Sequence, residues 1–70
     1  MKYREVTKRL KRLNCEEILP RKPGSHRIWW NLETDTEATI PDWGSKDLKT
    51  GTLRSALKKL GIDYKTFLNS

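Results

Sequence analysis

The single histidine of this 70-residue chain, His26, lies in a short stretch that combines an imidazole with several cations. Arg21, Lys22 and Arg27 are close to it in sequence, and Ser25 precedes it directly. An imidazole within reach of a substrate hydroxyl can act as a general base. Neighbouring cations can bind a phosphate and stabilise the charge that develops in phosphoryl transfer. The stretch therefore predicts a phosphoryl-transfer or phosphate-binding site, although a lone histidine at the start of a strand also fits a purely structural role.

Three tryptophans are the next candidates for binding: Trp29, Trp30 and Trp43. Stacking of a base on an aromatic ring is worth about 1–3 kcal/mol, so each is a candidate RNA contact. For Trp29 we expect packing in the core instead. For Trp30 and Trp43 three roles stay open, namely core packing, RNA contact and contact with a partner protein. Cys15 is expected to be a small half-buried apolar residue and not a nucleophile.

Metal and cofactor chemistry has no sequence signal here. No group of His, Cys, Asp and Glu has metal-ligand spacing, and no glycine-rich phosphate-binding loop is present. We therefore expect no metal ion and no cofactor. Cys15 cannot form an intrachain disulfide alone, and a secreted domain this small would usually need one, so we expect a cytoplasmic protein. No apolar run approaches the roughly 20 residues that span a bilayer, so no membrane contact is expected.

Charge is unevenly distributed along the chain, whose formal net charge is +6. Residues 1–30 carry nine Lys or Arg and three acids, a net +6, whereas residues 31–47 carry one Lys and five acids, a net −4. Residues 48–70 carry five basic residues and one acid, a net +4. Such an asymmetric field suits a polyanion bound on one side of the molecule. Basic helix faces that are merely solvated would give the same pattern.

Apolar periodicity predicts the helices that must support these residues. A first helix is expected from about Lys2 to Leu13, with Asn14 in a left-handed conformation after it; its apolar stripe is Tyr3, Val6, Leu10 and Leu13. A second helix is expected from Thr50, which can cap it, to Gly61, with the stripe Leu53, Leu57 and Leu60. Its first backbone N–H groups could also meet a phosphate. Asp63 is expected to cap one further turn that carries Tyr64, Phe67 and Leu68.

Three strands are predicted between the helices: Glu17–Lys22, His26–Leu32 and Ala38–Ile40. Pro23 and Gly24 suit the centre of a type II turn, and Pro41 ends the third strand or confines it to an edge. The acidic segment Glu33–Glu37 and the segment Asp42–Lys49 are expected to be loops.

A turn at residues 22–25 would pair Arg21 with His26 and Ile18 with Trp29. Alternation along the second strand then places His26, Ile28 and Trp30 on one face and Arg27 and Trp29 on the other. Both faces carry apolar residues, so the buried face stays open. Two-residue hairpins disfavour type II turns, so a bulge would shift this register.

The predicted order is α-β-β-β-α in one domain spanning residues 1–70, with a short helical tail. Seventy residues suffice for one small domain only. The economical packing for this order places two helices on one face of a three-stranded antiparallel sheet. The expected fold class is therefore α+β.

Several segments together resemble the HicA family of small toxins from bacterial and archaeal toxin–antitoxin pairs. They follow the order and spacing of the family over nearly the whole chain: Gly24-Ser25-His26, Ile40-Pro41, Gly51-Thr52-Leu53-Arg54, Gly61-Ile62 and Phe67. One departure stands out. Many relatives have a second histidine where this chain has Trp43-Gly44, so a two-histidine acid–base scheme is not available.

The resemblance implies a fold like that of double-stranded-RNA-binding domains and an mRNA-cleaving activity with His26 as the essential residue. It also implies a HicB-type antitoxin that covers this histidine. Because they lie beside His26, Arg21, Lys22, Ser25 and Arg27 are expected to contact the RNA, and with no ligand cluster the endoribonuclease is expected to be metal-independent. The alternative is a non-catalytic RNA-binding module of similar fold. The position of the histidine in a family-like motif favours the nuclease, and the oligomeric state stays open.

Overall fold

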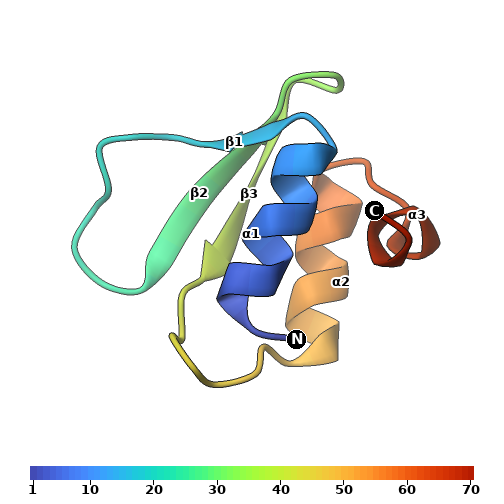
Figure 1. Ribbon diagram of the computed structural model, residues 1–70. Helices are drawn as coiled ribbons and strands as arrows, with labels where there is room; N and C mark the ends of the chain where they lie inside the picture. The colour runs from blue at the N-terminus through green and yellow to red at the C-terminus, as the bar shows by residue number, and fades with distance from the viewer.

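Three helices and three strands follow one another as α1-β1-β2-β3-α2-α3 in the computed structural model, which describes all 70 residues. Their bounds are α1 Tyr3–Arg12, β1 Cys15–Glu17, β2 His26–Asn31, β3 Thr36–Pro41, α2 Thr50–Lys59 and α3 Tyr64–Leu68. Figure 1 shows α1 and α2 side by side over one face of the sheet, with α3 beside them. This arrangement confirms the predicted α+β fold of the double-stranded-RNA-binding kind. None of the helices has the length and apolar character needed to cross a bilayer.

The helices form where the apolar stripes predicted them. Single residues account for most of the helix ends. Asn14 follows α1 with a φ of 63°, and Gly61 follows α2 with a φ of 69°; both are residues that tolerate the left-handed region after a helix. Asp63 caps α3, since its carboxylate accepts a hydrogen bond from Thr66 N at 3.2 Å. The expectation for Thr50 was wrong. It is the first helical residue, and the residue before it, Lys49, makes no side-chain cap.

The sheet is antiparallel with the strand order β1-β2-β3, but the predicted first hairpin was wrong. Glu17, not Ile18, pairs with Trp29, so the register differs by one residue. Pairing continues only to Ile18, whose N–H donates to the carbonyl of Ile28 at 2.8 Å. Residues 18–25 then form a long loop instead of a strand and a tight turn. Pro20 and Pro23 lack the N–H groups that a continued ladder would require, which explains why the strand ends early.

The second hairpin agrees better with the sequence. β3 extends beyond the predicted Ala38–Ile40 to Thr36 and Pro41, and it lies at an edge of the sheet as the proline suggested. The connecting turn is therefore shorter than the predicted loop, with Asp35 at a φ of 54°. His26 pairs with Pro41 at one end of β2, and Asn31 pairs with Thr36 at the other.

The helices bury the face of the sheet that carries Trp29, and this settles which face is internal. Trp29 is 1% exposed and donates its indole N–H to the Tyr3 hydroxyl of α1 at 3.1 Å. Asn31, also buried, donates from Nδ2 to the carbonyl of Leu60 at 2.7 Å and so ties β2 to the end of α2. The alternate residues of β2, beginning with His26, therefore lie on the open face. The apolar core consists of Tyr3, Val6, Leu10, Cys15, Trp29, Ala38, Ile40, Leu48, Leu53, Ala56, Leu57, Leu60 and Phe67.

Candidate functional site

His26 is the first residue of β2, and its side chain is exposed. It lines an open hollow of about 460 Å³ with four other residues, Lys22, Pro23, Ile28 and Thr39. Ile28 and Thr39 pair across β2 and β3, so they form the floor of the hollow on the open face of the sheet. Lys22 and Pro23 come from the loop that precedes β2. The fold therefore leaves the only histidine accessible to a large molecule, with one cation beside it.

Lys22 is the predicted phosphate contact that the structure brings to His26. It is exposed and forms no ion pair, so its ammonium group is free to meet an anion. Thr39 is a neighbour that the sequence did not reveal, because its place depends on the register between β2 and β3. Once that register is known, strand alternation puts its hydroxyl on the same face as His26.

Arg21 is not in this hollow. Its guanidinium binds the Glu17 carboxylate twice, Nε to Oε2 at 2.8 Å and Nη2 to Oε1 at 3.0 Å. The hydrogen bond and charge of Glu17 raise the pKa of Arg21 above its usual value. Arg21 lines a separate groove together with Tyr3 and Thr7 of α1, on the helix side of the sheet. Its positive charge is thus partly committed within the protein.

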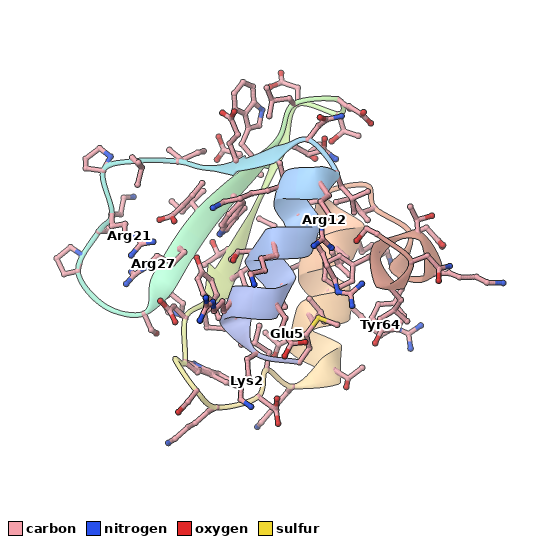
Figure 2. The ribbon with its side chains drawn as sticks, viewed as in Figure 1. Lys2, Glu5, Arg12, Arg21, Arg27 and Tyr64 are labelled. Atoms are coloured by element: carbon pink, nitrogen blue, oxygen red, sulfur yellow. The ribbon has the colours of Figure 1, made fainter.

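Arg27 and Ser25 hold the loop in front of His26. Arg27 donates from Nη1 to the carbonyl of Gly24 at 2.7 Å, and its Nε is buried without a partner. In Figure 2 the Arg21 and Arg27 side chains both point into the space enclosed by the loop between β1 and β2. The Ser25 carbonyl accepts a hydrogen bond from Asp42 N at 2.6 Å. These two bonds tie the end of the loop before His26 to β2 and to the residue that follows β3.

Trp30 lies on the open face of the sheet among acidic side chains. Glu16 and Glu37 are its partners on the two adjacent strands. Its indole N–H donates to Asp35 Oδ1 at 3.0 Å, and the ring is half-buried. Three carboxylates around one ring repel an RNA backbone, so this position favours contact with a protein over contact with RNA.

Trp43 lies at the opposite end of the sheet, in the loop that follows β3. It is 36% exposed and lines a hollow with Asp42 and Lys46. Since β3 ends at Pro41, the partner of His26, this loop begins beside the candidate site. The structure therefore separates two tryptophans that the sequence could not distinguish.

Positive charge is concentrated on the helices rather than on the sheet. The three helices contain nine Lys or Arg and one acid, a net +8, whereas the three strands contain one Arg and three acids, a net −2. The first residues of α1 and α2 lie at the same end of the molecule as the start of β2 (Figure 1). A polyanion is therefore attracted to the helical layer and to the His26 end, and repelled by the middle of the open sheet face.

No group of three or more His, Cys, Asp or Glu side chains is placed to hold a metal ion. Cys15 is buried against the core, and this burial raises the pKa of its thiol to about 11. A thiol in that environment is a poor nucleophile, because the thiolate is the reactive form. Cys15 thus packs as an apolar residue, as expected, but it is fully buried and not half-buried.

Comparison with known proteins identifies one family. A family model described as the HicA toxin of bacterial toxin–antitoxin systems matches residues 3–62. The matched range includes His26, Lys22, Trp30 and Trp43. No curated protein sequence and no solved structure gives a significant match.

Proposed function

Because this chain belongs to the HicA family of toxins of bacterial toxin–antitoxin systems, we propose that it cleaves mRNA with His26 as its catalytic residue. The main observation in support of this proposal is that the only imidazole is exposed in an open hollow beside Lys22. A hollow that opens on the sheet surface suits a polymer, because the strand can enter and leave on either side. Arg21, Ser25 and Arg27 belong to the proposal as further RNA contacts, with Lys22 as the principal one.

The chemistry assigned to these residues is attack by a ribose 2′-hydroxyl on the adjacent phosphorus. His26 takes the proton of the 2′-hydroxyl as the bond from that oxygen to phosphorus forms and the bond to the 5′ oxygen breaks. The products are a 2′,3′-cyclic phosphate and a 5′-hydroxyl, whose oxygen takes a proton from water. Lys22 stabilises the additional negative charge on the phosphoryl oxygens in the transition state. The proposed reaction uses side chains alone, in keeping with the lack of a metal-ligand cluster.

A cleavage assay with purified protein and an mRNA transcript, run with and without a chelator, tests this proposal. Positioned general-base catalysis is worth about 10²–10⁴ in rate. The cleavage rates of His26→Ala and His26→Gln should therefore each fall by at least about 10²-fold. The His26 side chain is exposed, so the free energy of unfolding should stay the same in both variants. A folded His26→Ala protein that cleaves at the wild-type rate would establish the alternative, a non-catalytic RNA-binding module.

The family also implies an antitoxin partner. We propose that a HicB-like antitoxin covers His26, places carboxylates near Lys22 and uses Trp30 as a central anchor. Aromatic side chains in the middle of an interface commonly contribute most of the binding energy. The carboxylates of Glu16 and Glu37 beside Trp30 would pair with basic side chains of the antitoxin.

Competition between the RNA and the antitoxin tests the partner proposal. Labelled RNA bound to His26→Ala protein should be displaced in full by the product of the adjacent gene. Trp30→Ala should weaken the protein complex and leave RNA affinity unchanged, because the carboxylates keep RNA away from this ring. RNA that stays bound at saturating antitoxin would show that the inhibitor does not cover the site.

A further inference from the structure

The three tryptophans differ in how their indole N–H groups are used. Trp29 donates to Tyr3 and Trp30 donates to Asp35, so both rings are held by the protein. The indole of Trp43 donates to no protein group, and the residue is 36% exposed against 1% for Trp29. This ring is therefore only partly covered by the protein, and no internal hydrogen bond holds it. Its exposed part and its indole N–H are available to a molecule outside the protein.

Hydrogen bonds hold the backbone around Trp43, although its indole N–H has no partner in the protein. Asp42 N donates to the Ser25 carbonyl at 2.6 Å, which ties the loop to the residue before His26. Gly44 N donates to Asp42 Oδ1 at 3.0 Å, and Lys46 N donates to the Trp43 carbonyl at 3.2 Å. Gly44 has a φ of 62°, a conformation that glycine adopts without strain. A ring on such a loop loses little freedom on binding, which favours affinity.

The connectivity also limits the distance between Trp43 and His26. Paired residues in an antiparallel sheet have Cα atoms up to about 5.5 Å apart, and His26 pairs with Pro41. Two further Cα–Cα steps of about 3.8 Å lead to Trp43. The Cα atoms of Trp43 and His26 are therefore within about 13 Å of each other. A base near the cleaved bond can reach the indole while its backbone passes the imidazole.

We infer that Trp43 is a stacking platform for one unpaired base of the RNA, next to the phosphate that His26 attacks. Lys46 and Asp42 line the same hollow as Trp43. The Asp42 carboxylate accepts the Gly44 N–H, and the Lys46 ammonium group would meet the phosphate of the stacked nucleotide. This inference rests on the proposed function for the nature of the substrate. It assigns the substrate class more narrowly, to single-stranded RNA, because a base inside a duplex has both of its faces covered by its neighbours.

The test measures the binding of single-stranded RNA of about 10 nucleotides, within the usual site size for such proteins, in the His26→Ala background. Trp43→Leu should weaken binding by about 5- to 150-fold, the factor to which a stacking energy of about 1–3 kcal/mol converts. Trp43→Phe should retain affinity within about threefold and lose most of the fluorescence quenching caused by RNA. Trp30→Leu is the matched control and should bind as the parent does.

A second arm uses RNAs with one abasic site, moved along the strand position by position. At the stacked position the abasic RNA should bind the parent as weakly as intact RNA binds Trp43→Leu, and combining the two changes should cost nothing more. Unchanged affinity of a folded Trp43→Leu protein for intact RNA would overturn the inference.

Cleavage kinetics separate this inference from the proposed function. With His26 restored, Trp43→Leu should raise KM with kcat nearly unchanged, because stacking holds substrate and transition state alike. If His26→Ala abolishes cleavage but Trp43→Leu leaves KM unchanged, the stacking role fails and the nuclease stands. If the wild-type protein binds RNA through Trp43 but never cleaves it, the nuclease fails and the stacking role stands.

Discussion

Removing the charge of Lys22 is the most direct test of where the RNA backbone lies. Lys22→Gln, Arg21→Gln and Lys65→Gln each lower the net charge by one, so differences among them report position and not total charge. Lys22 lies in the His26 hollow without an acidic partner. Arg21 is already paired with Glu17, and Lys65 lies on α3. We expect a large effect for Lys22 and small effects for the other two.

The expected magnitude follows from counterion release. Each contact with a single-stranded phosphate contributes about 0.7 to the slope of log affinity against log salt concentration. Lys22→Gln should therefore lower this slope by about 0.7. Between 50 and 200 mM salt, a fourfold change, the affinity advantage of the unmodified protein should shrink by about 2.6-fold.

Fluorescence anisotropy of a labelled RNA in the His26→Ala background, at several salt concentrations in that range, gives the slopes. Denaturation midpoints of the three variants provide the check on folding. Equal slopes for all three variants would mean that the attraction is diffuse and that the hollow is not the phosphate site. A larger loss for Arg21→Gln than for Lys22→Gln would move the RNA to the helix side of the sheet.

Two further predictions concern the fold that supports the site. Tyr3→Phe leaves the buried indole N–H of Trp29 without its acceptor, so the free energy of unfolding should fall by about 1–3 kcal/mol in urea denaturation; Tyr64→Phe, whose ring keeps its cation–π contact with Arg54, should change it little. Burial raises the pKa of the Cys15 thiol to about 11, from a value near 9 in the unfolded chain. Stability should therefore be constant below pH 9 with respect to this group and fall by about 2 kcal/mol toward pH 11, a loss that Cys15→Ala should lack.

The helices were predictable because their stripes repeat over several turns and because single residues mark their ends. Asn14, Gly61 and Asp63 act locally, through backbone conformation or one hydrogen bond, so a sequence suffices to place them. The lack of a side-chain cap before Thr50 was not predictable, since capping depends on where the preceding loop positions the backbone.

The prediction of the first hairpin was wrong because Pro23 and Gly24 lie in a long loop and not in a tight turn between paired strands. Pro23 and Gly24 do form a bend, and Gly24 has the positive φ that a turn glycine supplies. Because this bend lies within a long loop, however, it does not determine the register between β1 and β2. The register is set instead by burial, since Trp29 must face α1 and α2. A shift of one residue changes the face of every side chain in β1.

The composition of the site depends on the β1–β2 loop and on the register between β2 and β3, which is why sequence proximity to His26 was a poor guide. Arg21, Lys22 and Arg27 are neighbours along the chain, yet only Lys22 shares the hollow with the imidazole. Thr39, distant in sequence, lies on the hollow floor because its strand pairs with β2. The exposure of His26 does not depend on the register, because this residue lies at the very start of β2.

The open face of β2 would allow one protein surface to cover both Trp30 and His26, the proposed catalytic residue. His26 and Trp30 lie on the same face, four residues apart, which corresponds to about 13 Å along a strand. A standard interface covers about 800 Å² per partner, far more than a strip of that length requires. A protein anchored on Trp30 therefore reaches His26 without any change in the toxin. RNA and antitoxin would then need different tryptophans, Trp43 for the base and Trp30 for the protein, and would still exclude each other at the imidazole between them.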